Sequence, residues 1–174
     1  FGTKNPSDFM QYRDEVDEMG YNYDFQCALN GYGKQIEVNL PDSDTLIAHF
    51  IALSQKIGKQ KTQWRYSPVV FTETMNFSWH KAYFEFLASN LSGYTDVCIV
   101  SFLDEYKKIG KRLKSLGAYR PSDETIVRLM KEFRDIASAY GITIQSCTEY
   151  TDIEGIQKIG CINSDIINIV TGNS

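Results

Sequence analysis

The stretch TQWRYSPVVFT, residues Thr62–Thr72, decides how this chain folds, because a short aromatic strand pattern runs into a proline. Trp64 and Tyr66 favour the pleated surface of a sheet. Pro68 has no backbone N–H to give to a sheet ladder, so it opposes continuation of the strand. The pattern therefore predicts a strand that ends near Tyr66 and places Arg65 at its carboxyl end.

Segments with helix and strand patterns alternate on both sides of this stretch. Such alternation predicts parallel strands joined by right-handed helical crossovers. The apolar periodicity predicts helices over about 7–19, 44–57, 77–91, 106–116, 122–140 and 163–170. It predicts further strands over about 22–29, 96–102 and 142–147, and a partial strand at the start of the chain.

The fold class expected from this order is α/β, as one domain over residues 1–174. A complete eight-stranded barrel needs ~250 residues, and five strand patterns cannot close that circuit. We therefore expect an incomplete (β/α) barrel with exposed sheet edges. The strand pattern at the first residues, which begins inside a strand, supports this expectation.

The composition is that of an ordinary globular chain, with 43% hydrophobic and 23% charged residues. It contains no apolar run near the ~18 residues that a membrane span needs. The formal net charge of -4 argues against broad nucleic-acid binding. We expect a cytoplasmic protein that does not enter a membrane.

The motifs of several common enzyme classes are missing from the sequence. It has no GxGxxG, no GxxxxGK[ST] and no GxSxG, so dinucleotide-binding, P-loop and serine hydrolase functions lack support. Its four cysteines are far apart and have no CxxC spacing. Buried, reduced thiols are the favoured interpretation, and a metal site or a disulfide is the alternative.

Two segments carry titratable or charged groups whose role the sequence leaves open. His80 lies on the apolar stripe of the helix over 77–91, where hydrogen-bonded packing is more common than catalysis. Five basic residues over 107–114 form either a solvated helix face or a patch that steers anions toward the strand ends.

Polar side chains follow the carboxyl ends of the predicted strands, where parallel sheets bind ligands. Basic and amide groups there would hold and orient an anionic small molecule or a phosphate-bearing substrate. A carboxylate would transfer protons or face a cation, although each residue alone is also consistent with loop capping. The expected binding residues are Lys4, Asn5, Gln26, Arg65, Tyr66 and Ser101, and the expected catalytic residues are Asp104 and Glu149.

Several short motifs follow one another along nearly the whole chain. They are Thr3–Pro6 (TKNP), Phe25–Gln26, Gly31–Gly33, Trp64–Tyr66 with Pro68, His80, Ser101–Phe102 with Asp104, Tyr106–Lys108, Cys147 with Glu149, and Cys161–Ile162. In this order they resemble the motifs of a bacterial family known as domain of unknown function 1848 (DUF1848).

The resemblance implies a barrel-like α/β protein similar to radical S-adenosylmethionine enzymes. An iron–sulfur cluster and S-adenosylmethionine would then serve a full-length protein, with no cofactor held in this chain. The chain departs from the family pattern at Gly2, where Trp is usual, and at Ser67 and Asn163, where Asp is usual. The loss of two carboxylates weakens an acid–base or cation-binding role at those positions.

Two function classes remain open from the sequence. One is the barrel portion of a radical S-adenosylmethionine-like enzyme with an anion-binding cleft at the strand ends. The other is a non-catalytic anion-binding or interaction module.

Overall fold

The computed structural model describes residues 1–103, 115–147, 152–160, 167–168 and 171. These residues form one open sheet of six parallel strands in sequential order, with helices between strands, which confirms the α/β class. The strands are β1 Gly2–Thr3, β2 Phe25–Ala28, β3 Thr62–Val69, β4 Val97–Phe102, β5 Thr143–Ser146 and β6 Gln157–Lys158. The helices are α1 Ser7–Glu18, α2 Gly33–Ile36, α3 Ser43–Ile57, α4 Phe77–Leu91 and α6 Asp123–Ala139, with a 3-10 turn η1 at Lys59–Lys61.

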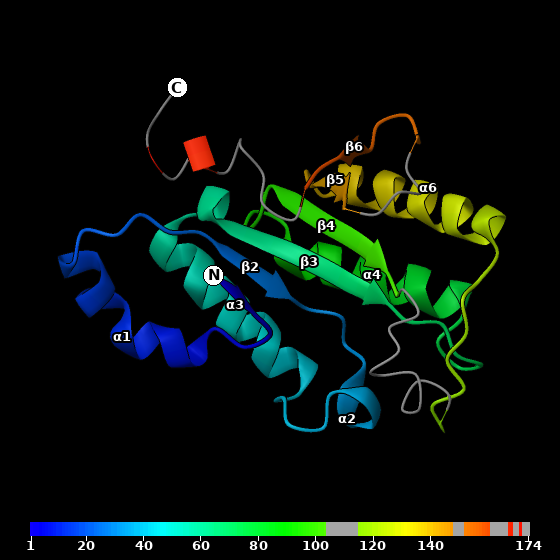
Figure 1. Cartoon of the computed structure of the whole chain (residues 1–174), viewed down its shortest axis with the longest axis horizontal. Helices are drawn as coiled ribbons and strands as arrows, with labels where there is room; N and C mark the ends of the chain where they lie inside the picture. Colours follow the sequence, from blue (N-terminus) through cyan, green and yellow to red (C-terminus); the bar gives the residue numbers. More distant parts are fainter. Residues whose placement is uncertain (104–114, 148–151, 161–166, 169–170, 172–174) are drawn as a thin grey trace.

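The sequential strand order places the main helices on one face of the sheet. Each crossover moves one strand further in the same direction, so right-handed connections put successive helices on the same side. Figure 1 looks onto the sheet with α3, α4 and α6 behind it. The opposite face of β2 to β5 is therefore turned away from these three helices.

Aromatic side chains of β3 form the centre of the core between the sheet and the helices. Trp64 stacks on Phe84 of α4 at a ring-centroid distance of 4.8 Å, and Phe84 stacks on Phe133 of α6 at 4.1 Å. Tyr66 meets the rings of Phe84 and Phe133 edge-on. All four side chains are fully buried. The packing of aromatic rings in this arrangement fixes which face of β3 looks toward the helices.

The strand β3 does not end at Tyr66, and in this respect the sequence prediction is wrong. It continues through Pro68 to Val69, and its register with β4 shifts between Tyr66 and Val69. Pro68 is accommodated in this irregular stretch, where a missing N–H does not interrupt a regular ladder. Its carbonyl accepts a hydrogen bond of 2.6 Å from the hydroxyl of Tyr32.

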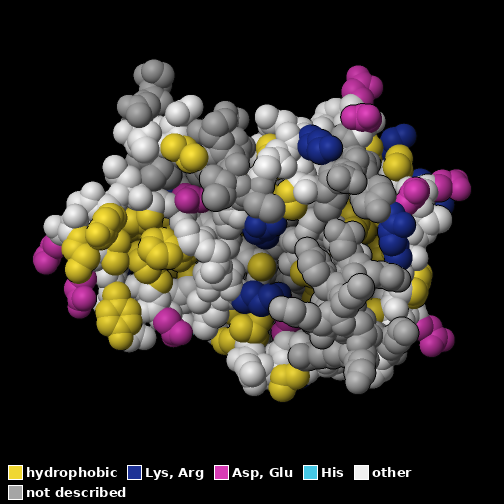
Figure 2. Space-filling view, viewed as in Figure 1, with side chains coloured by type: hydrophobic (Ala, Val, Ile, Leu, Met, Phe, Trp, Pro, Cys, Tyr) yellow, Lys and Arg dark blue, Asp and Glu magenta, His cyan; other side chains and the backbone are white. Residues whose placement is uncertain are grey.

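Helix α1 has a different surface from the one that its apolar spacing predicts. No residue of α1 is buried. Phe9 packs against the core, whereas Tyr12 is exposed on the helix and Met19 just beyond its end. Hydrophobic side chains accordingly gather over α1 in Figure 2. Among the described helices, none is both long and apolar enough to cross a membrane.

The remaining elements agree with the predicted order but not with every boundary. Strand β2 is shorter than predicted, and β6 and α2 were not predicted from the sequence. Helices α3, α4 and α6 begin at capping residues whose side chains accept backbone hydrogen bonds, as the polar residues before them indicate. The helices predicted over 106–116 and 163–170 lie largely outside the described residues.

The loop after β2 is fastened to the end of β3 by side-chain hydrogen bonds. Asn30 accepts from the Ser67 amide at 2.8 Å and donates to the Ser67 carbonyl at 2.9 Å. Tyr32 also accepts from the Val70 amide at 2.9 Å. Between these two residues Gly31 has a φ of 67°, a conformation that suits glycine. These bonds hold the two chain segments together where the strands end.

His80 has a structural role in the core, in line with the packing interpretation. Its Nε2 lies 3.0 Å from the Val70 carbonyl, which can only accept, so Nε2 carries the proton. Its Nδ1 therefore accepts from the Tyr66 hydroxyl at 2.8 Å. Burial lowers the pKa of His80 from 6.5 to about 4 and raises the pKa of Tyr66. Both side chains are neutral at pH 7.

We predict that His80 makes folding sensitive to mild acid. Its folded pKa lies below the unfolded value, so between about pH 4 and 6.5 the unfolded chain binds the additional proton. The free energy of unfolding should therefore fall as pH decreases through this window, by at most about 3 kcal/mol from this residue. Urea denaturation of the wild type and of His80→Gln at several pH values measures this change in the free energy of unfolding. A pH dependence that is the same in both proteins would contradict the prediction.

Gly31 provides a second test, because it lies against an aromatic ring. A Cβ at Gly31 would lie 1.9 Å from the Tyr83 ring, whereas one at Gly33 would meet nothing within 4 Å. Both have positive φ, so each Ala variant pays a similar backbone cost. Gly31→Ala should lose about 1 to 3 kcal/mol more than Gly33→Ala in denaturant unfolding, the usual cost of overpacking. Equal losses would show that the ring contact is not limiting.

Candidate functional site

The face of β2 to β5 opposite α3, α4 and α6 carries polar side chains, and we call it the polar face. Because Trp64 and Tyr66 point toward the helices, the alternate residues Gln63 and Arg65 point the other way. Figure 2 shows basic side chains near the middle of this face, over β3. The strand register and side-chain alternation assign to it Gln26, Gln63, Arg65, Ser67, Ser101, Gln145 and Cys147.

Arg65 brings together side chains from both sides of the polar face. Its Nη1 donates to Gln26 Oε1 at 2.8 Å, and its Nη2 donates to the Cys147 sulfur at 3.5 Å. Gln26 is on β2 and Cys147 follows β5, and these strands are about 14 Å apart in a flat sheet. One guanidinium that reaches both groups is consistent with a sheet that curves toward this face. Three of the residues predicted or highlighted from the sequence therefore meet at one point.

A second polar group lies at the carboxyl end of β3 and β4. The hydroxyls of Ser67 and Ser101 are in hydrogen-bond contact. The Ser67 backbone is held on both its N–H and its C=O by Asn30, which is buried. The group is thus positioned by the same hydrogen bonds that fasten the β2 loop to β3.

Three of the predicted binding residues have partners elsewhere. The Tyr66 side chain is fully buried on the helix side with His80, so it does not reach the polar face. Lys4 forms an ion pair with Glu37 at the end of α2. Asn5 Oδ1 lies 2.9 Å from His49 Nδ1 of α3 and also accepts from the Ser7 amide. The structure joins Lys4 and Asn5 to α2 and α3 rather than to Arg65.

The two predicted catalytic residues, Asp104 and Glu149, lie outside the described residues. The same holds for the basic run over 107–114 and for Asn163. Their roles in proton transfer and anion steering therefore stay predictions from the sequence.

The described cysteines lie in two different surroundings. Cys27 and Cys98 are buried on the helix side, and both are register partners of Trp64, which stands between them. Cys147 is on the polar face, and Cys161 lies outside the described residues. Among the described residues, no three His, Cys, Asp or Glu side chains gather as a metal site.

Three polar residues of this region are not among the binding residues expected from the sequence. Gln63 and Ser67 lie two residues before and after Arg65 on β3, and Asn30 holds the Ser67 backbone. Gln63, Arg65 and Ser67 alternate with aromatic residues along β3. This period of two was the available signal, because it predicts a strand with one polar face.

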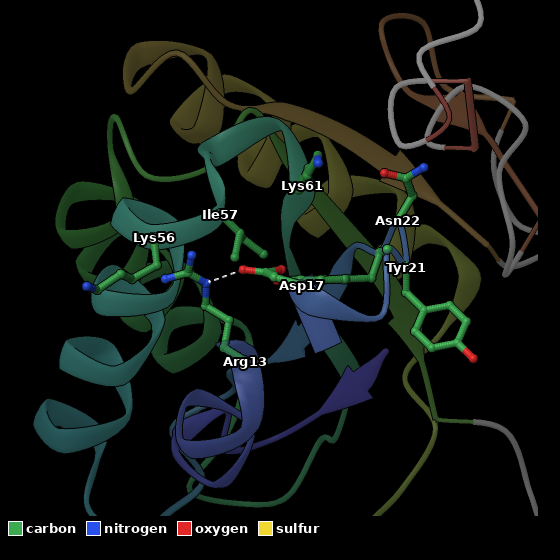
Figure 3. Close-up of a pocket in the computed structure, with 9 residues that line it drawn as sticks. Arg13, Asp17, Tyr21, Asn22, Lys56, Ile57 and Lys61 are labelled. Carbon is green, nitrogen blue, oxygen red and sulfur yellow. Dashed lines mark hydrogen bonds and ion pairs between the residues drawn. The ribbon is translucent and has the colours of Figure 1, made fainter. Parts of the chain in front are cut away.

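A hollow of about 320 Å³ lies at the opposite, amino-terminal end of the strands. In it Asp17 accepts hydrogen bonds from the Tyr23 hydroxyl at 2.6 Å and from Arg13 at 2.9 Å, which lower the pKa of Asp17. Figure 3 shows Arg13 pointing toward Asp17, while Lys56 points away from that pair. This end of a parallel α/β sheet is typical of stabilising rather than catalytic residues. Arg13 and Asp17 form an ion pair, whereas Lys56 and Lys61 give the lining of this hollow an excess of positive charge.

Comparison with known proteins identifies the family of the chain. The family model described as "Domain of unknown function (DUF1848)" matches residues 1–174. The chain belongs to the DUF1848 family. The match confirms the resemblance to this family that the short motifs indicate. A search of curated proteins found no match.

The different surroundings of the cysteines predict selective labelling of the folded DUF1848 chain. Cys27 and Cys98 are buried, and burial raises the pKa of Cys27 to about 12 and also raises that of Cys98. Cys147 is only half-buried. N-ethylmaleimide should therefore modify Cys147 in the native protein but reach Cys27 and Cys98 only after unfolding, as residue-resolved mass spectrometry will show. Native labelling of all three at similar rates would contradict the placement of β2 and β4.

Proposed function

We propose that this DUF1848 chain binds a small anion, a carboxylate or a phosphate, through Arg65 on the polar face. The observation that carries the proposal is the set of side chains that contact the Arg65 guanidinium. Arg65 is half-buried, and among the described residues its side chain donates to Gln26 and Cys147. Among the described residues, no Asp or Glu forms an ion pair with it. A half-buried cation with such partners favours an anionic ligand.

The chemistry of arginine suits this role. A guanidinium has five N–H donors in a rigid fork, and the fork matches the geometry of a carboxylate or phosphate. The bonds to Gln26 and Cys147 hold Arg65 in place and use two of its five N–H groups. Partial burial strengthens the attraction, because the local dielectric is lower than that of water.

The position of Arg65 also supports the proposal. In parallel α/β sheets ligands bind beyond the carboxyl ends of the strands. Arg65 is not at the carboxyl end of β3, where the sequence predicts it, but is the fourth of its eight residues, level with Ala28 at the end of β2. Ser67 and Ser101 follow toward the carboxyl end of the sheet. Their hydroxyls are neutral donors and acceptors that can orient an anion beside the guanidinium.

Anion binding is common to both function classes that the sequence leaves open. A radical S-adenosylmethionine-like enzyme would add Asp104, Glu149 and an iron–sulfur cluster. A non-catalytic module would need none of these. The proposal for this chain is therefore limited to binding.

Substitution of Arg65 tests the proposal directly. Arg65→Lys keeps the charge but loses the bidentate fork, so phosphate affinity should fall by about 1 to 3 kcal/mol, or roughly 5- to 150-fold. Arg65→Ala should abolish binding. Isothermal titration calorimetry with inorganic phosphate at low ionic strength measures both effects.

The matched control is Lys56→Ala, which removes a cation at the opposite end of the strands. Its phosphate affinity should equal that of the wild type. The rival interpretation is that Arg65 forms a buried ion pair with Asp104 or Glu149. In that case Arg65→Ala would lose roughly 3 to 5 kcal/mol of folding stability. Such a loss, with unchanged phosphate binding, would remove Arg65 from the site.

A further inference from the structure

The polar face contains side-chain amides where barrel interiors usually have branched apolar residues. Gln26 of β2 and Gln63 of β3 are register partners, and Gln145 of β5 and Gln157 of β6 are register partners too. An amide has two donors and an acceptor that need partners when they are buried. An amide group of these glutamines that lacks a partner therefore indicates which group a ligand would supply.

Two of these four amide oxygens accept a hydrogen bond from another side chain of the sheet. Gln26 Oε1 accepts from Arg65 at 2.8 Å, and Gln157 Oε1 accepts from Gln145 Nε2 at 3.0 Å. Gln63 differs from them. Its Oε1 is buried, only 7% of the residue is exposed, and none of the described residues donates to that oxygen.

A buried carbonyl oxygen without a donor is costly, because it has lost its hydrogen bonds to water. The cost is recovered when a ligand or a bound water supplies an N–H or O–H group. Gln63 and Arg65 point to the same face two residues apart, and their Cα atoms are therefore separated by about 6.6 Å. One small molecule is long enough to meet both side chains.

We propose that the ligand of Arg65 is a small anion that also carries an N–H or O–H group, which donates to Gln63 Oε1. The inference rests on the proposed function, since Arg65 holds the anionic end. Gln63 lies closer to the start of β3 than Arg65 does, so the donor points along the sheet toward the amino-terminal ends of the strands. The substrate class is an amino- or hydroxyl-bearing carboxylate or phosphate, with its two polar groups about 7 Å apart.

Two phosphates of matched size provide the test, 4-aminophenyl phosphate and 4-methylphenyl phosphate. They differ only in the donor at the end remote from the phosphate. Isothermal titration calorimetry should show that the amino compound binds about 3- to 10-fold more tightly to the wild type, the usual gain from one hydrogen bond. In Gln63→Leu and in the unbranched variant Gln63→Met, the two affinities should become equal.

The control is Gln55→Leu, which replaces an exposed glutamine of α3 and should keep the preference. If neither compound nor inorganic phosphate binds, or if binding survives Arg65→Ala, the proposed function fails and this inference fails with it. If inorganic phosphate binds through Arg65 but neither compound does, only this inference fails. If both bind through Arg65 with equal affinity, the proposed function stands and the role of Gln63 is overturned. A preference that survives in both Gln63 variants overturns that role as well. Occupation of Gln63 by a water would appear as equal affinities together with a lower unfolding temperature of Gln63→Met.

Discussion

The packing of Trp64 and Tyr66 against Phe84 and Phe133 is the constraint on which the rest of the structure depends. Strand side chains alternate, so burial of these two aromatic residues turns Arg65 toward the other face of the sheet. A slip of one residue would exchange the two faces and bury a guanidinium among aromatic rings. The cost of such a buried charge makes the observed register strongly preferred. The core thus determines where the candidate site can form.

Around Pro68, where the ladder between β3 and β4 is irregular, side chains of the loop after β2 bond the backbone of β3. Asn30 and Tyr32 together bond the backbone of Ser67, Pro68 and Val70. The indole N–H of Trp64 also donates to the Leu29 carbonyl at 2.9 Å. The loop after β2 and the last residues of β3 therefore form one fastened unit. A rigid support of this kind reduces the conformational entropy that the protein loses when a ligand binds.

The sequence predicts the fold better than it predicts the site. Helical and strand periodicities gave the order of the elements, because they depend on local burial patterns. The continuation of β3 past Pro68 was not predictable, because the hydroxyl that donates to the Pro68 carbonyl belongs to Tyr32, 36 residues earlier. Likewise, nothing local shows that Tyr66 bonds His80 on the helix side or that Arg65 reaches Cys147. The alternation of Gln63 with its aromatic neighbours was local, and it would have identified the polar face.

The central claim is that an anion binds at Arg65 on the polar face and not among the basic residues at the opposite end of the strands. NMR of the arginine side-chain ¹⁵N–¹H groups during a phosphate titration tests it most directly, with assignments from single-arginine variants. The account predicts that the Arg65 resonances shift and saturate while those of Arg13, bonded to Asp17, stay unchanged. Saturable shifts at Arg13 with none at Arg65 would contradict it.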